Sequence, residues 1–316
     1  MSTYHWKKPF VIFMVLFSTF IVTLMSGGQS LAYENASQAT TLEKAVTQSI
    51  LALGYTPQYG ILVTTLAAQT EFVYGSVAFI VSAEGGPISY LFLAQRVGGN
   101  WQVSLEGTQT FYSLLKSNPG QLVSQNERSI LISGDGISIE GNGSAQLSLP
   151  FGTGETWTLT GGPHGNLTGY ERPWSALDLQ SQDSGHQGLA RAAADGIAHL
   201  TCGGRIGNFI RLDHANGWQT GYFHIAASSI TVNDGQSVSR GQVLGRISTE
   251  SAPAGSACHG DASGPHVHFS LRRNGAVQAW DGMDVGGWTA HDGSAAYNGC
   301  LTRVRDNYTR CQWHGI

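Results

Sequence analysis

Two histidines one residue apart, His266 and His268, stand in the segment Gly-Pro-His-Val-His-Phe-Ser at positions 264–270. Side chains two residues apart along a β-strand point to the same face of the sheet. Both imidazoles therefore project together, while Val267 turns into the opposite layer. Neutral imidazole binds Zn²⁺ and also serves as a general base. The pair alone does not define a site, because surface and core histidines also occur at this spacing.

Three further side chains could complete such a site. His164 lies in a Gly-Gly-Pro-His-Gly segment, and His224 ends the segment Gly-Tyr-Phe-His. Asp178 lies between Leu177 and Leu179 in a strand-like run. A carboxylate among apolar residues needs a partner. A bound cation would provide one, and backbone hydrogen bonds are the alternative.

Taken together and in this order, these residues resemble the lysostaphin-type zinc metallopeptidase family, and within it the beta-lytic and staphylolysin branch. The segments 211–218 and 234–242 are similar as well, and the resemblance covers about residues 147–316. It implies one Zn²⁺ per chain, held by His164, Asp178 and His268. A fourth position would be left for water, as a catalytic zinc site requires.

The same resemblance implies that His224 and His266 do not bind the metal. They would hydrogen-bond the reacting water and the developing oxyanion, as general base and electrostatic stabiliser. Tyr297 resembles a family tyrosine that can donate to the oxyanion, and Tyr222 is the competing candidate. A groove lined by Trp174 and Tyr222 would favour small substrate side chains, although Trp174 could equally belong to the core.

The four cysteines all lie in the C-terminal half, as do ten of the eleven histidines. Four cysteines allow three pairings into two disulfides, and disulfides suit an oxidising compartment. The resemblance implies the pairs Cys202–Cys258 and Cys300–Cys311. Metal-binding and redox-capable chemistry is therefore expected after residue 143.

The N-terminus has the order of a cleavable signal peptide. Lys7 and Lys8 precede an apolar run over residues 10–25, and the small residues Ser30 and Ala32 follow. We therefore expect residues 1–32 to direct export and the protein to be secreted. An uncleaved membrane anchor is the alternative, since the run is only slightly shorter than the ~20 residues that span a bilayer.

Residues 33–140 are expected to form a small α+β prodomain or accessory domain. Residues 41–54 have helical spacing, with Thr40 or Thr41 as N-cap and Gly54 as terminator. Strands are predicted over 72–82, 88–96 and 101–106, with hairpin turns at 85–86 and 98–99 and a short helix over 111–115. Residues 117–148 are rich in Ser, Asn and Gly, which indicates a linker or activation loop.

Residues 141–316 are expected to form the zinc metallopeptidase domain, built as an antiparallel β-sandwich or barrel-like sheet pair. Short strands are predicted over 208–212, 218–224, 232–238, 241–245 and 267–272, with tight turns at 216–217 and 274–275. The fold class of the whole chain is thus mainly β.

The composition and net charge of the chain exclude some classes of function. The chain has 316 residues, of which 12% are charged and 42 are Gly, and its net charge is −4. Such a balance argues against a nucleic-acid partner and fits an exported protein with many tight turns. We expect a monomer with no stable membrane association after signal cleavage.

We expect a zymogen whose prodomain covers the site until it is cut near residues 140–148, because a stretch rich in Gly, Asn and Ser lies just ahead of the catalytic unit. The resemblance implies that the mature form is a zinc endopeptidase. It would cut peptide cross-links, with a preference for Gly-containing bonds, in bacterial cell-wall peptidoglycan. The alternative outside the enzymes is a non-catalytic scaffold protein that has the same fold and only binds peptidoglycan. A zinc carboxypeptidase or amidase acting on the same polymer would differ only in the bond that is cut.

Overall fold

The computed structural model describes residues 42–133, 146–185, 188–202, 208–312 and 314–315. The chain divides into two compact units, residues 1–44 and residues 45–316, and the second unit is described here. The predicted signal peptide lies outside the described residues. Among the helices that are described, none has the length and apolar character needed to cross a membrane.

The first part of the second unit is a four-stranded antiparallel sheet in the order β1-β2-β3-β4. Its strands are β1 (Leu62–Gln69), β2 (Phe72–Phe79), β3 (Ile88–Val97) and β4 (Asn100–Leu105). The three predicted strands are confirmed. Strand β1 was missed because its sequence, LVTTLAAQ, lacks the alternation of apolar and polar residues that marks a half-buried strand.

Residues 42–52 are helical, as the spacing of apolar residues predicts. Val46 and Ile50 are fully buried four residues apart, on one face of the helix. Gly54 follows with φ of 86°, a left-handed conformation in which glycine commonly ends a helix. The predicted N-cap residues lie outside the described residues.

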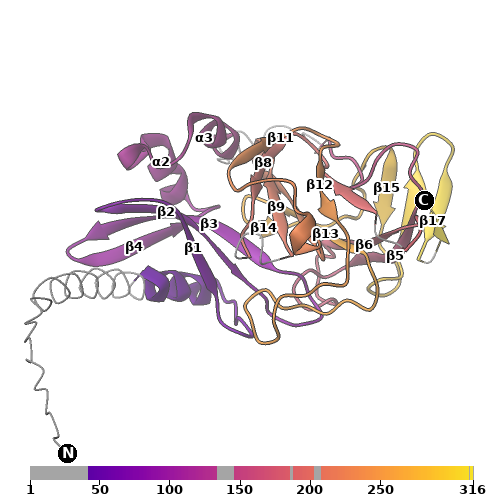
Figure 1. Ribbon diagram of the computed structural model, residues 1–316, viewed down its shortest axis with the longest axis horizontal. Helices are drawn as coiled ribbons and strands as arrows, with labels where there is room; N and C mark the ends of the chain where they lie inside the picture. The colour runs from indigo at the N-terminus through magenta and orange to yellow at the C-terminus, as the bar shows by residue number, and fades with distance from the viewer. Residues whose placement is uncertain (1–41, 134–145, 186–187, 203–207, 313, 316) are drawn as a thin grey trace, which may run out of the picture. The chain divides into compact units, whose positions relative to one another are not determined.

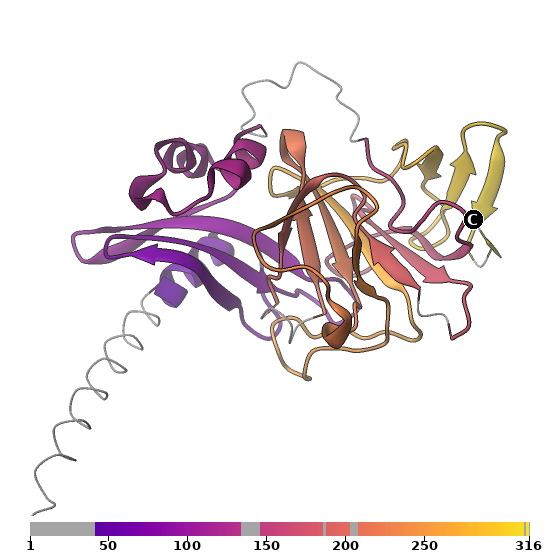
Figure 2. The same ribbon diagram turned by 45° about the horizontal axis from the view of Figure 1, so that its top comes forward.

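Two helices follow the sheet and pack on one of its faces, which Figure 2 shows above the strands. They are α2 (Gln109–Ser117) and α3 (Gln125–Ile132), joined by the 3-10 turn η1 (Pro119–Gln121). The prediction of a linker beginning at residue 117 is wrong over α3. Its polar sequence, QNERSILI, looks like a loop, but the Ser124 side chain caps its first turn by accepting from the Glu127 N–H.

The second part of this unit is built on one large antiparallel sheet, in the order β11-β8-β9-β10-β13-β6-β5-β18 with β14 paired to β13 (Figure 1). Two smaller sheets, β12-β7 and β15-β16-β17, accompany it. The strands are β5 (Trp157–His164), β6 (Ala176–Ser181), β7 (Leu189–Arg191), β8 (Gly196–His199), β9 (Ile210–Asp213), β10 (Trp218–Phe223), β11 (Gln236–Val238), β12 (Val243–Arg246), β13 (Val267–Arg273), β14 (Ala276–Val277), β15 (Trp288–His291), β16 (Cys300–Arg303), β17 (Tyr308–Cys311) and β18 (His314–Gly315). The prediction of a mainly β, antiparallel fold is confirmed.

Tight turns fix the register of the central hairpins. Asn216 and Gly217 have φ of 60° and 72° between β9 and β10, and Asn274 and Gly275 have φ of 50° and 77° between β13 and β14. Positive φ at both central positions is the requirement of the type I′ hairpin turn, which Asn-Gly satisfies best. Both predicted turns are therefore confirmed.

The two faces of the large sheet have different roles. One face carries Leu177, Val267 and Phe269, which join the main hydrophobic core together with residues of the small β12-β7 sheet. On the opposite face, Asp178 of β6 pairs with His268 of β13, which in turn pairs with Phe223 of β10. Directly paired residues share a face, so the polar face of the sheet brings the metal-capable side chains together.

Further along the same face, buried charged groups contact the first part of the unit. The Arg211 side chain donates to Glu106 Oε2 at 2.5 Å and to Asp213 Oδ1 at 3.1 Å and 2.5 Å. Gln219 donates to Glu106 Oε1 at 2.8 Å. The Arg272 guanidinium donates to the Ser89 carbonyl at 2.5 Å. Residues 45–133 are therefore joined to the large sheet by paired, buried polar groups, which would be costly to leave unpaired.

His199 lies in the same network and is fully buried. Its Nε2 is 3.3 Å from Asp213 Oδ2 and 3.5 Å from Glu127 Oε1, and its Nδ1 is 3.6 Å from Asp234 Oδ1. The hydroxyl of Tyr74 donates to Glu127 Oε1 at 2.5 Å. Burial opposes protonation of His199, but Asp234, Asp213 and Glu127 outweigh it and raise the His199 pKa.

We expect the variant His199→Gln to lose a pH-dependent part of the stability. A raised pKa means that the folded protein favours the imidazolium form of His199. The stabilisation from His199 is therefore fully present below about pH 6.5, the ordinary pKa of histidine. It disappears as the pH rises through the raised pKa. Urea unfolding at about pH 6 and about pH 9 should therefore show a larger deficit of the variant at the lower pH. Equal deficits at both values would contradict this role.

Candidate metal centre

His164 ends β5, where the strand departs from regular pairing with β6. The register shifts between Leu159 and Gly161 and again between Gly161 and His164. Bulges of this kind re-aim side chains at the edge of a site. A Cβ on Gly161 would lie 2.6 Å from the Asp178 carboxylate, so glycine leaves the room that this carboxylate occupies. The irregular strand thus places His164 and Asp178 beside each other.

The three predicted ligands converge. His164 Nε2 lies 3.3 Å from His268 Nδ1 and 3.5 Å from Asp178 Oδ1. His268 Nδ1 lies 3.1 Å from Asp178 Oδ1. Donor atoms bound to one tetrahedral zinc at about 2.0–2.1 Å lie about 3.3–3.4 Å apart. The three atoms therefore have the spacing of one face of such a tetrahedron.

The hydrogen bonds on the far sides of both rings fix which nitrogens face the centre. His164 Nδ1 donates to the Gly162 carbonyl at 2.8 Å, and His268 Nε2 donates to the Asn166 side-chain oxygen at 2.9 Å. When both rings are neutral, the facing nitrogens carry lone pairs that are directed at each other and at a carboxylate. Such an arrangement of acceptors is repulsive without a cation, and the donor set of two imidazoles and one carboxylate suits Zn²⁺.

Charge and burial agree with this reading. Burial lowers the His164 pKa to about 4, with His268 and His266 adding to the effect against the opposing charge of Asp178. Burial raises the pKa of Asp178, but His164, His266 and His268 outweigh it and hold that pKa far below the usual range. Near neutral pH the centre thus contains a neutral imidazole at His164 and an ionised carboxylate, the forms that bind metal.

Two more predicted histidines lie at the same centre. His266 Nδ1 donates to the Gly264 carbonyl at 2.9 Å, and its Nε2 lies 3.6 Å from Asp178 Oδ1. The ring centroid of His224 is 4.6 Å from that of His266. Burial, followed by the nearby His266 and His268, lowers the pKa of His224 well below its ordinary value. His224 also has φ of 63°, an uncommon conformation for a residue with a side chain and one that clusters at functional sites.

Tyr297 lies at the site. Tyr222 and Trp174 were predicted to line a substrate groove, but both are buried instead. The Tyr297 ring stacks on His164 with centroids 4.1 Å apart, and its φ is 70°. Tyr222 is fully buried in the core, where its hydroxyl contacts Thr220 Oγ1 and accepts from the Ala193 N–H. Trp174 is 5% exposed beneath the guanidinium of Arg172. Tyr222 therefore cannot compete with Tyr297, and the proposed lining by these two rings is wrong.

Asn166 is a site residue that was missed from the sequence. Its side chain is 1% exposed and holds His268 from behind, as described above. The sequence contained a signal for it, because Asn166 lies two residues after the predicted ligand His164 in a Gly-rich segment.

Replacing Asn166 by Ala is expected to weaken zinc binding by about 10- to 100-fold, because partners behind a ligating histidine fix its orientation. Competition with a zinc-binding dye measures the affinity directly. Asn298→Ala is the matched control, since Asn298 is exposed and follows Tyr297 on the rim of the site. Equal affinity in Asn166→Ala and wild type would remove this positioning role.

Comparison with known proteins adds an independent observation. The sequence profile of peptidase family M23 matches residues 173–280, which include Asp178, His224, His266 and His268. The beta-lytic metalloendopeptidase of Lysobacter enzymogenes is 31% identical over 173 residues, covering 51% of this chain and 91% of that protein. The beta-lytic metalloendopeptidase of Achromobacter lyticus is 30% identical over 174 residues, and this match covers 51% of this chain and 44% of that protein.

Among solved structures, the M23 metalloprotease pseudoalterin is 27% identical, with a TM-score of 0.46, and the match covers 54% of this chain and 97% of pseudoalterin. The matches to the two beta-lytic enzymes each involve about half of this chain.

Proposed function

The chain belongs to peptidase family M23, and from this premise we propose that it is a zinc-dependent endopeptidase acting on the peptide cross-links of bacterial peptidoglycan. The observation that carries the proposal is the convergence of His164 Nε2, Asp178 Oδ1 and His268 Nδ1 at mutual distances of 3.1–3.5 Å. These three residues would hold one Zn²⁺ per chain. Zinc, when bound, activates water near neutral pH and polarises a carbonyl group.

The residues around the ligands have separate tasks in this proposal. His266 donates from Nδ1 to the Gly264 carbonyl and directs Nε2 toward the centre, so its neutral ring can take the proton of the attacking water. His224, whose Nδ1 is buried without a hydrogen-bond partner, can donate to the charge that develops on the carbonyl oxygen. Burial, with Asp178 nearby, raises the pKa of Tyr297, which keeps its hydroxyl protonated as a second donor.

The substrate part of the proposal rests on the relatives. Two carry the name beta-lytic metalloendopeptidase, and others are called protease LasA and DD-carboxypeptidase/endopeptidase Mpg. We propose that Gly-containing bonds are preferred here.

We further propose that the protein is made with a signal peptide over residues 1–32 and a prodomain over residues 33–140, and that the secreted mature enzyme comprises residues 141–316. The disulfides Cys202–Cys258 and Cys300–Cys311 are formed, as the resemblance implied, and they suit an oxidising compartment. Part of the expected cleavage region lies outside the described residues. The amino terminus of the secreted form tests this organisation.

Digestion of purified, cross-linked peptidoglycan tests the activity. We expect soluble fragments with new glycine amino termini in mass spectrometry, and none after zinc is chelated. Fragments that lack only a terminal residue, or that are separated from the sugar chain, would indicate a carboxypeptidase or an amidase instead. Binding to the wall without any new amino terminus would indicate the non-catalytic scaffold.

A further inference from the structure

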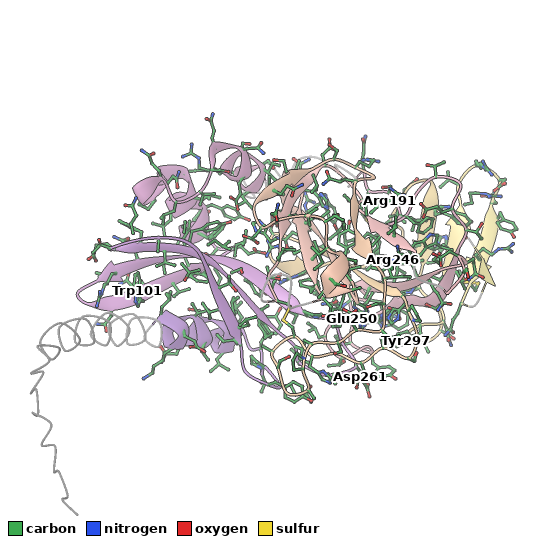
Figure 3. The ribbon with its side chains drawn as sticks, in the orientation of Figure 1. Trp101, Arg191, Arg246, Glu250, Asp261 and Tyr297 are labelled. Carbon is green, nitrogen blue, oxygen red and sulfur yellow. A yellow bond between two sulfur atoms is a disulfide. The ribbon has the colours of Figure 1, made fainter. Side chains whose placement is uncertain are left out.

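The loop between β15 and β16, residues 292–299, brings Tyr297 to the metal centre. Tyr297 is labelled in Figure 3 and lies three residues before β16 begins at Cys300. Its ring stacks on His164 with the two ring planes only 17° apart. Its φ of 70° is unfavourable for a residue with a side chain, and such a conformation persists only where the surrounding structure imposes it. The restraints on this loop therefore decide whether Tyr297 stays at the site.

Backbone contacts dock the loop on the strand that leads to His164. The Gly162 N–H donates to the Tyr297 carbonyl at 2.9 Å, and the Tyr297 N–H donates to the Pro163 carbonyl at 3.2 Å. A Cβ on Gly162 would lie 2.4 Å from the Gly299 carbonyl oxygen, so the two main chains are in direct contact. A small displacement of residues 297–299 would therefore break both hydrogen bonds and move the tyrosine ring.

The C-terminal end of the loop is held covalently. Cys300, the first residue of β16, pairs with Cys311 of β17 and forms a disulfide with it. On its other side Cys300 pairs with His291 of β15. The following residue, Leu301, is fully buried in the main core. Leu301 thus holds β16 on the core, and the disulfide holds the residue of that strand that is nearest to Tyr297 along the chain.

The N-terminal end of the loop is held by weaker interactions. The Asp292 carboxylate accepts from Arg172 Nη1 at 2.6 Å, and the Asp292 N–H donates to Asp281 Oδ1 at 2.9 Å. The Arg172 side chain is 61% exposed. Ion pairs of exposed side chains contribute little to stability. The disulfide is therefore the strongest of the restraints described here on the conformation of Tyr297.

We propose that the Cys300–Cys311 disulfide is a positioning pair for Tyr297, and that it keeps the tyrosine hydroxyl where it can donate to the oxyanion. This inference rests on the proposed peptidase function. Neither cysteine belongs to the three proposed ligands, so the disulfide would act on turnover only through Tyr297. Without it, residue 297 relaxes toward negative φ and the ring leaves His164, while the three ligands still bind zinc. A shift of about 1 Å in a group that contacts the transition state is enough to lower turnover strongly.

The double variant Cys300→Ser/Cys311→Ser tests this proposal, alone and combined with Tyr297→Phe. Each variant is expressed as the full chain and assayed, in its secreted and zinc-loaded form, on a soluble tetraglycine peptide. We expect Tyr297→Phe to lose about 10²-fold in kcat, as when one oxyanion donor is removed. The cysteine variant should lose about tenfold or more, with KM and zinc content unchanged. In the Tyr297→Phe background the cysteine substitutions should cost less than about twofold, because the hydroxyl that they misplace is absent.

Thr302→Ala/Thr309→Ala is the matched control. These two threonines pair across the same two strands, with their hydroxyl oxygens 2.9 Å apart. Their removal weakens the same hairpin but leaves the disulfide beside the loop, so kcat should stay at the wild-type value. Cys300→Val/Cys311→Val is a second test variant, since β-branched residues suit a cross-strand pair if the serine variant does not fold. Thermal unfolding shows which variants are folded.

A fluorine label on the ring of Tyr297 gives a measurement that does not depend on activity. In wild type and in the threonine control, stacking on His164 should move its NMR resonance away from the position in the unfolded chain. In the folded cysteine variants we expect more than half of this shift to be lost.

The outcomes separate the two hypotheses. If the resonance keeps its shift in the cysteine variants, or if the losses in kcat from the cysteine and Tyr297→Phe substitutions simply multiply, the positioning role is refuted and the peptidase function stands. If the shift is lost in the cysteine variants but no form of the protein cleaves the peptide, the disulfide still positions Tyr297 and the proposed function fails.

Discussion

The variant Asp178→Ala is expected to lose stoichiometric zinc and to retain less than about one thousandth of the wild-type turnover. Asp178 is the only carboxylate among the three proposed ligands, and its Oδ1 lies within 3.6 Å of the facing nitrogens of His164, His266 and His268. Its removal leaves three imidazoles with no negative charge between them. Metal analysis and digestion of peptidoglycan by the processed enzyme measure the two losses.

Asp183→Ala serves as the control, because Asp183 is exposed just after β6 and lies on the same stretch of chain. The variants His164→Ala and His268→Ala should behave like Asp178→Ala. Full zinc content in any of the three variants would place the metal elsewhere and would contradict the ligand assignment.

The second large effect concerns turnover without loss of metal. His266→Ala and His224→Ala should each retain one zinc per chain and lose about 10²- to 10⁴-fold in kcat, the range for removal of a positioned acid or base. Neither side chain belongs to the group of three donor atoms, yet both lie beside it. The measurement pairs zinc analysis with kcat on a soluble glycine peptide.

His291→Ala is the matched control, since His291 is exposed on β15. If His266→Ala lost its zinc together with its activity, His266 would be a ligand and not a base. If His224→Ala turned over at the wild-type rate, the proposed stabilisation of the oxyanion would have to come from Tyr297 alone.

Much of the site was predictable because it depends on local periodicity. The alternation along β13 requires His266 and His268 to face away from Val267, and the alternation along β6 requires Asp178 to face away from Leu177. Once β6 and β13 pair in register, His268 and Asp178 must meet. A sequence pattern of this kind predicts the face of the sheet on which a side chain lies. Which distant segments meet at the site was inferred from the family resemblance.

The parts that could not be predicted depend on long-range packing. Tyr222 has the residue type of a site aromatic, but whether it faces the core or the groove follows from the layer of β12 and β7 that covers its side of the sheet. His199 has neighbours typical of a strand end, and only the fold brings Glu127 and Asp213 to it. The glycines at 85 and 86 were predicted as turn residues, but neither has a positive φ, and a Cβ on either would clash with neighbouring atoms. A sequence does not distinguish the need for positive φ from the need for space.

X-ray absorption at the zinc edge of the processed enzyme tests the central claim most directly. The account predicts one zinc whose inner shell contains two imidazole nitrogens at about 2.0–2.1 Å, with carboxylate and solvent oxygens at about 2.0–2.2 Å. In His164→Ala and His268→Ala the zinc edge itself should be largely lost, because these variants are expected not to hold stoichiometric zinc. A shell of oxygen atoms alone, a sulfur ligand, or an unchanged spectrum in both variants would contradict it.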